Sequence, residues 1–445
     1  MPPTKFTTTR DGASVAYQTW GDGPVNISWF PYIWGHVELS WEDPGLRRAF
    51  ERFGSIGRVA FFDKRGSGLS DPLDRAATLD DRMDDARAVL DAAGMDRAYI
   101  GGMSEGGPLA ILFAATYPER VDGLVLVNTA GGPLPGTSDE VLEQLVAAQR
   151  ARWEEFLAMW GDPASPLVDM FVPSMTHDDS FRRWATRFST NSMRPAAVRR
   201  AFDLAFAMNV NALLPLIQVP TLVIHVTGDR VIPMMFGQHL AEQIPNARFE
   251  SFDCDDHMYV CGSMREPIID CIEEFIRGTK PSSTPPGRAL ATVLMTDIVG
   301  STATATRMGD ERWRQVLDAH DDGVGDAIAQ SRGRVVKSTG DGVLATFDSP
   351  SRAIECALMV RDRAAKLGLE VRVGMHTGEI ELRGDDIGGL AVHLAARVEA
   401  CANAGDVLVS RTVRDLVVGA GFRFEDRGTH EMKGLEGTWE LSAVV

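Results

Sequence analysis

The chain has 445 residues and a mass of 48.5 kDa, and its 45 Lys and Arg residues face 62 Asp and Glu residues, a formal net charge of −17. At about 100–200 residues per domain, this length predicts two or three domains with cores of their own. The composition, 44% hydrophobic and 24% charged, excludes disordered, collagenous and coiled-coil proteins. The isoelectric point near 5.0 argues against a nucleic-acid surface, because such surfaces neutralise phosphates with Lys and Arg. A local basic pocket for one nucleotide is compatible with this charge.

Cysteine usage and the lack of long apolar runs indicate the cellular compartment. The five cysteines are an odd number and form no Cys-x-x-Cys pair, which argues against a disulfide framework or a structural zinc site. The N-terminal segment lacks the apolar core of a signal peptide. No run of about 18 apolar residues occurs, as a membrane span would require. We therefore expect a cytoplasmic protein that neither spans a membrane nor binds nucleic acid.

A change in composition near residue 280 divides the chain. The segment from Gly278 to Gly287 holds three prolines and two glycines among small polar residues, which is typical of a linker. We place the linker at 279–288, a first domain at 1–278 and a second domain at 289–445.

The first domain alternates short β-branched or aromatic runs with helical patterns. Such alternation predicts an α/β fold with a mostly parallel sheet that is covered on both faces. Residues from about 135 to 210 break the rhythm with helical patterns rich in Trp and Phe, and predict an inserted helical cap. In chain order, strands are predicted at Val25–Phe30, Arg58–Asp63, Ala98–Gly102, Gly123–Asn128, Thr221–Thr227 and Arg248–Phe252, and helices at Arg82–Ala93 and Gly107–Tyr117.

A serine stands at a predicted strand-to-helix turn, in Gly102-Met-Ser-Glu-Gly106. A sharp turn at this place exposes the hydroxyl of Ser104 above the sheet and directs the next N–H toward a developing oxyanion. Asp229 follows the strand Thr221–Thr227, and His257 follows the last predicted strand. All three residues lie at carboxyl ends of strands, where ligands bind in open α/β sheets. The pattern predicts a Ser–Asp–His triad.

The first domain resembles the α/β-hydrolase superfamily over nearly its full length. It also carries the segment Asp63-Lys-Arg-Gly-Ser-Gly-Leu-Ser70, which is common in the esterase and haloperoxidase-like branches of that superfamily. The resemblance implies that Ser104 is the nucleophile, His257 the general base and Asp229 its orienting acid. It also implies a pocket for a small ester or an apolar ligand.

One segment departs from the family pattern. The usual His-Gly pair after the third strand is absent, and Phe30-Pro-Tyr-Ile-Trp34 takes its place. We therefore expect the second oxyanion donor to be a backbone N–H near Tyr32 or Ile33.

The second domain has a different order of elements, which predicts an α+β fold. Two of its carboxylates stand at predicted turns. Asp297 ends an apolar strand, and Asp341 lies in the hairpin turn Thr339-Gly-Asp-Gly342. In chain order we predict a strand at Ala291–Ile298, a helix at Asp310–Gln330, strands at Arg334–Ser338 and Val343–Phe347, a helix at Ser351–Lys366, an extended segment at Glu370–Glu381, a helix at Leu390–Cys401 and a strand at Val407–Val409.

If the hairpin pairs beside the first strand, the two carboxylates meet at one sheet edge, where they repel each other unless a cation lies between them. Two Mg²⁺ ions about 3.5–4 Å apart would bind both the attacking and the leaving oxygen of a phosphoryl displacement. The turn after Asp297 opens a helical region, and backbone N–H groups there suit phosphate oxygens. The candidate phosphate-binding residues are Val299, Gly300, Ser301 and Thr302.

Residues 289–445 closely resemble the catalytic domain of class III adenylate/guanylate cyclases, a ferredoxin-like α+β domain that mycobacterial-type cyclases join to an α/β-hydrolase domain. The resemblance implies a metal site at Asp297, Ile298 and Asp341 for two divalent ions, Mg²⁺ or Mn²⁺. Lys337 matches the lysine that reads the adenine ring, and Asp386 matches its partner at the exocyclic amine. A lysine donor suits adenine N1 and a carboxylate suits the N6 amine, so ATP is favoured over GTP.

Three further residues match family positions. Arg397 matches the arginine that stabilises charge on the α-phosphoryl group, and Lys433 matches the triphosphate-binding lysine. His393 stands where many members have an asparagine that orients the ribose. The i, i+4 spacing places His393 and Arg397 on one helix face.

The implied reaction is attack of the ATP 3′-hydroxyl on the α-phosphorus, which releases pyrophosphate and gives 3′,5′-cyclic AMP. The family also implies a homodimer whose two sites each take residues from both chains. Two alternatives concern the first domain. It is either an esterase or lipase-like serine hydrolase in a bifunctional enzyme, or a ligand sensor that controls the cyclase.

Overall fold

The computed structural model describes residues 1–73, 75, 77–278, 288–338, 340–383, 386–435 and 437–445. The chain divides into two compact units, Met1–Thr284 and Pro285–Val445. Of the predicted linker, only residue 288 lies within the described part, where it begins a strand. No helix in the described ranges is long and apolar enough to cross a membrane.

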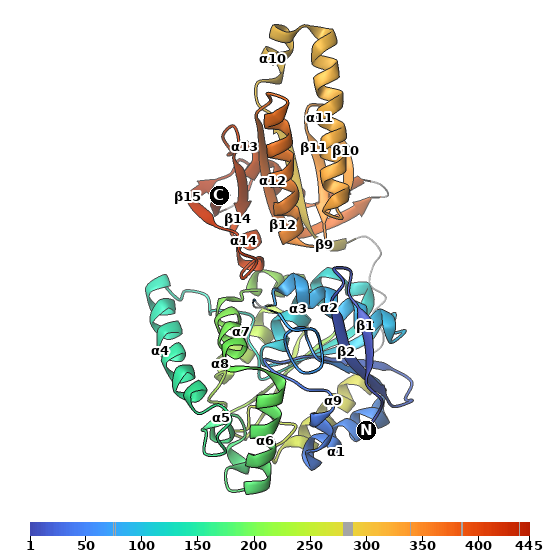
Figure 1. Ribbon diagram of the computed structural model, residues 1–445, viewed down its shortest axis with the longest axis vertical. Helices are drawn as coiled ribbons and strands as arrows, with labels where there is room; N and C mark the ends of the chain where they lie inside the picture. Colours follow the sequence, from blue (N-terminus) through green and yellow to red (C-terminus); the bar gives the residue numbers. More distant parts are fainter. Residues whose placement is uncertain (74, 76, 279–287, 339, 384–385, 436) are drawn as a thin grey trace. The chain divides into compact units, whose positions relative to one another are not determined.

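The first unit is built on an eight-stranded sheet in the order β1-β2-β4-β3-β5-β6-β7-β8 (Figure 1). Strands β4, β3, β5, β6, β7 and β8 are parallel neighbours, whereas β1 and β2 are antiparallel. The mostly parallel sheet expected from the sequence is thereby confirmed. The strands are β1 (Lys5–Thr8), β2 (Ser14–Trp20), β3 (Asn26–Phe30), β4 (Arg58–Phe62), β5 (Ala98–Met103), β6 (Val121–Val127), β7 (Thr221–Val226) and β8 (Arg248–Phe252).

Helices cover both faces of this sheet, with α1 and α9 on one face and α2, α3 and α8 on the other (Figure 1). Apolar side chains of α1, such as Phe53, and of α9, such as Ile272, bury themselves in one core. The helices are α1 (Pro44–Ile56), α2 (Leu79–Ala92), α3 (Gly106–Thr116), α8 (Met234–Gln243) and α9 (Arg265–Gly278), with 3₁₀ turns at Leu39–Trp41, Pro118–Arg120, Pro173–Met175 and Asn211–Leu216.

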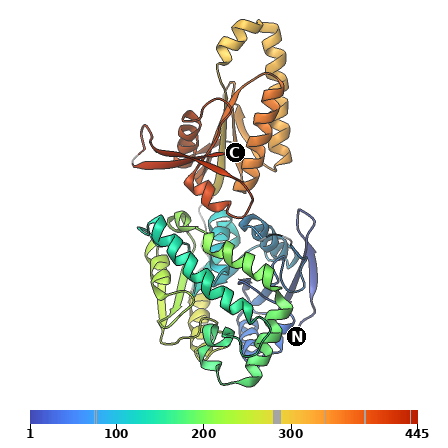
Figure 2. The same ribbon diagram turned by 60° about the vertical axis from the view of Figure 1, so that its left-hand side comes forward.

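A helical insertion between β6 and β7 occupies the stretch predicted as a cap. Figure 2 shows two of its helices, α4 and α7, side by side. The rings of Trp153 and Phe202 stack between them with centroids 3.6 Å apart. The inserted helices are α4 (Asp139–Ala158), α5 (Leu167–Phe171), α6 (Asp179–Ser192) and α7 (Pro195–Ala207).

The second unit has its own sheet, in the order β10-β11-β9-β12-β14-β16-β15, with β13 paired to β12. Its strands are β9 (Arg288–Ile298), β10 (Arg334–Ser338), β11 (Val343–Phe347), β12 (Val371–Arg383), β13 (Asp386–Gly388), β14 (Val407–Ser410), β15 (Phe424–Glu431) and β16 (Thr438–Val444). Its helices are α10 (Ser301–Met308), α11 (Asp310–Gln330), α12 (Pro350–Lys366), α13 (Leu390–Ala400) and α14 (Arg411–Leu416).

Alternation along β9 decides which side chains face which helices. Leu294 and Ile298 belong to a core with residues of α11 and α12. Ala291 and Val293 belong to a core on the opposite face with residues of α13. Asp297 is an even number of residues from Val293, so both side chains point to the same face of the sheet. The Asp297 carboxylate therefore lies on the face that α13 covers.

Candidate active sites

Ser104 lies on a strained turn between β5 and α3. Its φ is +53°, in the left-handed region that non-glycine residues rarely adopt. The turn is held by the Ser104 carbonyl, which accepts hydrogen bonds from the Gly107 N–H (3.1 Å) and from the Thr129 hydroxyl (2.5 Å). A Cβ at Gly107 would lie 2.0 Å from Thr129 Oγ1, so glycine is required there. The local sequence thus forms the geometry of a nucleophile elbow.

The predicted acid and base of the triad are brought together. His257 Nδ1 lies 2.7 Å from Asp229 Oδ2, and both side chains are fully buried. Asp229 Oδ1 accepts the backbone N–H groups of Val231 (2.8 Å) and Ile232 (3.0 Å), which fixes the carboxylate. In the described part of the chain, His257 Nε2 has no hydrogen-bond partner, Ser104 included. Such bonds often form only when substrate is bound.

His225 of β7 is a second buried imidazole near the triad. Its Nε2 bonds to the Ile232 carbonyl at 2.8 Å and lies 3.7 Å from Asp229 Oδ2. Burial lowers the pKa of His225, so the ring is neutral near pH 7. The Asp229 carboxylate therefore pairs with His257, and not with a charged His225.

A cavity of about 50 Å³ adjoins Ser104, and Tyr32 and Ile33 lie in its wall. These two residues carry the N–H groups expected to serve as the second oxyanion donor. Aromatic side chains form much of the remaining wall, from the segment after β3 and from the cap: Trp34, Phe171, Phe181, Trp184 and Phe188.

Sequence reasoning missed a buried ion cluster directly behind the serine. The Glu105 carboxylate pairs with Lys64 Nζ and with Arg82 Nη2, each at 2.5 Å, and all three side chains are at most 3% exposed. Burial alone would raise the pKa of Glu105, but the charges of Arg82 and Lys64 hold it below its usual value. Burial lowers the pKa of Lys64 to about 8. Glu105 also carries the N–H expected at the oxyanion, so the cluster fixes that donor.

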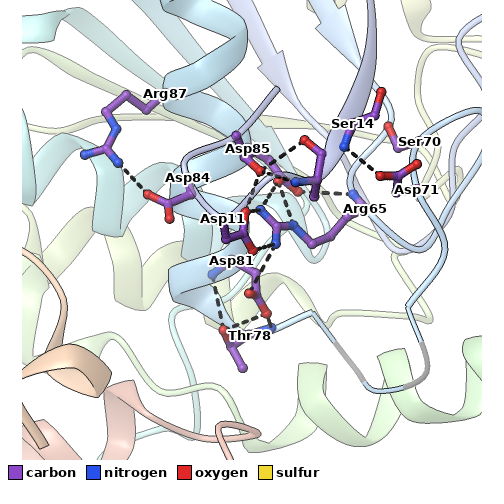
Figure 3. Close-up of polar contacts among 12 residues, drawn as sticks. Asp11, Ser14, Arg65, Ser70, Asp71, Thr78, Asp81, Asp84, Asp85 and Arg87 are labelled. Atoms are coloured by element: carbon purple, nitrogen blue, oxygen red, sulfur yellow. Dashed lines mark hydrogen bonds and ion pairs between the residues drawn. The ribbon is translucent and has the colours of Figure 1, made fainter. Parts of the chain in front are cut away.

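The cluster continues outward through Arg65, shown in Figure 3. Arg65 pairs with Asp85 (2.7 Å) and with Asp11 (2.5 Å), which lies in the turn between β1 and β2. Burial raises the pKa of Asp85 to about 6 against the opposing charge of Arg65. Asp81 caps α2 reciprocally with Thr78. The Asp63–Ser70 segment therefore has a structural role in anchoring β1, β2 and α2.

In the second unit, Asp297 lies beside two charged residues that the sequence analysis did not select. Arg372 Nη2 donates to Asp297 Oδ2 at 2.6 Å, and Arg372 Nε lies 2.5 Å from Glu399 Oε1. Register explains the contact, because Arg372 of β12 stands opposite Asp297 of β9. Burial raises the pKa of Glu399, and the charges of Asp297 and Asp341 add to the rise. Both aspartates therefore lie within electrostatic reach of Glu399.

Asp341 precedes β11, which pairs directly with β9, and the Val343 N–H donates to Thr296 Oγ1 at 3.0 Å. Asp297 and Asp341 thus stand at the same end of neighbouring strands, both partly exposed. Among the described residues, no group of three or more His, Cys, Asp and Glu side chains is arranged to bind a metal ion. Two carboxylates suit Mg²⁺, which is held in nucleotide enzymes by one or two carboxylates plus substrate phosphates.

The predicted base-reading residues meet within one chain. Lys337 Nζ lies 2.9 Å and 2.8 Å from the two carboxylate oxygens of Asp386. Both side chains are about half exposed, so the pair presents a donor and an acceptor side by side to solvent.

The predicted phosphate cradle needs one correction. The Val299 N–H donates to the Glu370 carbonyl at 2.8 Å and is therefore not available to a phosphate. Gly300 has φ +64° and precedes α10, which starts at Ser301. The first N–H groups of a helix have no intrahelical partner, so the candidate phosphate-binding N–H groups are those of Gly300, Ser301 and Thr302.

His393, Arg397 and Lys433 are all exposed. Within the described residues, His393 and Arg397 make no hydrogen bond or ion pair with Asp297 or Asp341. Lys433 follows β15 and lines a shallow depression with Glu431 and Thr438.

Comparison with known proteins matches each unit to a different family. Residues 42–260 match the alpha/beta hydrolase fold, and residues 288–443 match the adenylate and guanylate cyclase catalytic domain. An esterase from Exiguobacterium antarcticum shares the fold of the first unit, with a TM-score of 0.51 at 18% identity over 62% of this chain and 100% of that chain.

Two curated relatives agree with this division. A 2-hydroxymuconate semialdehyde hydrolase of Pseudomonas putida is 31% identical over 225 residues, which cover 50% of this chain and 79% of that protein. A protein named "Putative adenylate cyclase 3" of Rhizobium meliloti is 35% identical over 167 residues, which cover 34% of this chain and only 27% of that protein. The chain therefore belongs to the α/β-hydrolase family in its first unit and carries an adenylate/guanylate cyclase catalytic domain in its second.

Proposed function

We propose that the protein converts ATP to 3′,5′-cyclic AMP and pyrophosphate. The observation that carries the choice of ATP is the Lys337–Asp386 pair, which presents an ammonium donor and a carboxylate acceptor together. Adenine offers the complementary pattern, with an acceptor at N1 and a donor at N6. Guanine offers the reverse pattern, a donor at N1 and an acceptor at O6.

Each remaining residue has a distinct part in this proposal. Asp297 and Asp341, with the Ile298 backbone between strand end and turn, would hold two divalent cations. Such cations, when bound, lower the pKa of the attacking 3′-hydroxyl and neutralise phosphate charge. The Lys433 ammonium binds the triphosphate, and the N–H groups at the start of α10 bind phosphate oxygens. His393 orients the ribose, and the Arg397 guanidinium stabilises charge that develops on the α-phosphoryl group.

The geometry of α13 supports a site shared between two chains. Glu399 faces Arg372 and the metal carboxylates of its own chain. Arg397, two residues earlier, points elsewhere because residues i and i+2 do not share a helix face. A partner chain must then supply the guanidinium that meets Asp297. We therefore propose a homodimer with two equivalent sites.

Exposed apolar side chains support the same assembly. Leu390, Val335 and Leu382 are 59%, 47% and 45% exposed. They lie on α13, β10 and β12, next to the residues that read the base and the ribose. All three elements contact β13, so these side chains gather in one region, and a gathered apolar surface is typical of interaction sites.

Incubation of the purified protein with ATP and Mg²⁺ or Mn²⁺ tests the proposal. We expect cyclic AMP, identified by its mass, and no cyclic nucleotide from an Asp297→Asn variant. A sample that is dimeric and binds Mn²⁺ but forms no cyclic nucleotide would contradict it.

We expect Arg372 to compete with a metal for Asp297, because its guanidinium donates two hydrogen bonds to Oδ2 of that carboxylate. Arg372→Ala is expected to tighten Mn²⁺ binding in the absence of nucleotide by about two- to fivefold, the range expected for losing one partly exposed ion pair. Electron paramagnetic resonance of free Mn²⁺ measures the change. The control is Arg361→Ala, since Arg361 pairs with Asp362 on α12. Weaker binding by Arg372→Ala would show that Arg372 assists the metal instead.

The triad residues of the first unit support a second activity. The Asp229–His257 pair and the left-handed Ser104 have the arrangement of a serine esterase. We propose that Ser104 Oγ bonds to an ester carbonyl carbon while His257 Nε2 takes the hydroxyl proton. His257 then gives this proton to the alcohol as the C–O bond to the alcohol breaks, which leaves the acyl group on Ser104. In the second step His257 takes a proton from water, the water oxygen bonds to the acyl carbon, and the proton returns to Ser104 Oγ as the acyl bond to Ser104 breaks.

Ser104→Ala distinguishes this activity from a sensor role. For a hydrolase, we expect loss of p-nitrophenyl ester hydrolysis by at least about 1,000-fold, as for other triad nucleophiles, with unchanged cyclase output. Thr129→Ser keeps a hydroxyl on the Ser104 carbonyl and serves as the control. If the wild-type protein hydrolyses no ester and Ser104→Ala alters cyclase output, the first unit is a ligand sensor.

A further inference from the structure

The cavity beside Ser104 contains no charged side chain among the described residues that line it. Its polar side-chain atoms belong to hydroxyl, thiol, thioether and indole groups, and burial keeps the ionisable ones neutral. Burial raises the pKa of the Tyr32 phenol and of the Cys261 thiol well above their usual values. A carboxylate in this cavity would therefore lose its hydration without gaining a cation, which is strongly unfavourable.

The cavity is also small, because aromatic rings fill most of the space between the cap and the sheet. Phe188 and Trp184 stack with centroids 5.0 Å apart, and Trp34 contacts Phe171 edge to face at 5.4 Å. The volume is about 50 Å³. At about 10–15 Å³ for each water-sized group, this space accepts about three to five non-hydrogen atoms.

A buried polar atom also points to a ligand at this place. His257 is 0% exposed and its Nε2 atom has no partner in the described structure. The Phe171 ring packs edge to face on His257, with centroids 5.6 Å apart, and also lines the cavity. His257 does not itself line the cavity, but Ser104 does. An unpaired buried nitrogen is costly, and the Ser104 hydroxyl or a ligand oxygen bound beside it would satisfy Nε2.

We propose that this cavity is an acyl site for short uncharged acyl groups, acetyl to butyryl, and that it excludes acyl groups that are long or carry a carboxylate. The proposal rests on the hydrolase activity proposed above, whose substrate class it names. The alcohol part of the ester lies outside this cavity, and the proposal places no limit on its size.

The experiment measures turnover and binding separately with one series of probes. The probes are p-nitrophenyl acetate, butyrate, octanoate and hydrogen succinate. Turnover is measured with the full-length wild-type protein after subtraction of the Ser104→Ala rate. Binding is measured by calorimetry with the Ser104→Ala protein, which retains the ester. We expect kcat/KM and affinity to fall at least about tenfold from butyrate to octanoate, and about 100-fold from butyrate to hydrogen succinate.

Variants of Phe188 show whether cavity size sets the preference. Phe188→Leu is expected to move the best chain length upward by removing part of the ring, and Phe188→Ala to move it further. If Phe188→Ala does not fold, the leucine variant still gives the direction. Phe206, a partly buried residue of the cap outside the cavity wall, supplies the control Phe206→Leu, which should leave the preference unchanged.

Each result decides between the two proposals. Preferred binding of short neutral esters without turnover would refute the hydrolase activity and support the acyl site. Turnover without preference for length or charge would support the hydrolase and overturn the acyl site. Failure of every probe to bind would also overturn the acyl site.

Discussion

Mixing an Asp297→Ala chain with an Arg397→Ala chain, each inactive alone, is expected to restore about a quarter of wild-type cyclase activity. Random exchange makes about half of the dimers mixed, and each mixed dimer has one intact site of two. Both substitutions remove charged groups that act on the phosphoryl transfer, so each should cost at least about 1,000-fold alone. Activity is measured as cyclic AMP formed after subunit exchange.

A matched mixture controls for indirect effects. Asp297→Ala mixed with Asp341→Ala should restore nothing, because both carboxylates belong to the same half of the site at neighbouring strand ends. Recovery in this control, or none in the first mixture despite verified mixed dimers, would rule out the shared site. In a single-chain site, α13 would have to present Arg397 to the side where Glu399 lies.

Reversing the polarity of the base-reading pair is expected to reverse nucleotide choice. In the double variant Lys337→Glu with Asp386→Lys, the introduced carboxylate accepts from guanine N1 and the introduced ammonium donates to guanine O6. At about 1.5–3 kcal/mol for each charge-assisted hydrogen bond, two reversed bonds change the GTP-to-ATP ratio of kcat/KM by about 100-fold or more. The ion pair itself is retained, and its half-exposed position makes its contribution to folding small.

A single substitution distinguishes a change in base recognition from a general loss of activity. Lys337→Ala should lower ATP turnover without a gain in GTP turnover. If the double variant keeps its ATP preference while still binding Mn²⁺ like wild type, then Lys337 and Asp386 do not read the base.

Periodicity predicted the central strands of the first sheet, but it missed the buried strand β2 and the amphipathic helices α1 and α9. The helix predicted at Asp310–Gln330 is α11 with the same bounds, and the strand predicted at Thr221–Thr227 is the fully buried β7. The short strand β1, Lys5–Thr8, was missed because its exposed, polar sequence has no apolar alternation. Strand β15 was missed for a similar reason, since most of its side chains are exposed.

The candidate site residues could be found where they follow strand ends. Ser104, Asp229 and His257 each follow the carboxyl end of a predicted strand. Because these ends lie at the same edge of a parallel sheet, their order along the chain was enough to predict that Asp229 and His257 meet. The contacts of Glu105 with Lys64, and of Asp297 with Arg372, depend on register between strands and loops far apart in the sequence. A single sequence does not specify that register. The Val299 N–H was assigned wrongly for the same reason, because its partner, the Glu370 carbonyl, is also far from it in the sequence.

The most direct test of the cyclase proposal offers wild-type protein ATP and GTP together at equal concentration, with Mn²⁺, and identifies each product by mass. The proposed base-reading pair predicts 3′,5′-cyclic AMP with one pyrophosphate per cycle, in large excess over cyclic GMP, and neither product from Asp297→Asn. Preferential formation of cyclic GMP, or no cyclic nucleotide from a dimeric sample that binds Mn²⁺, would contradict it.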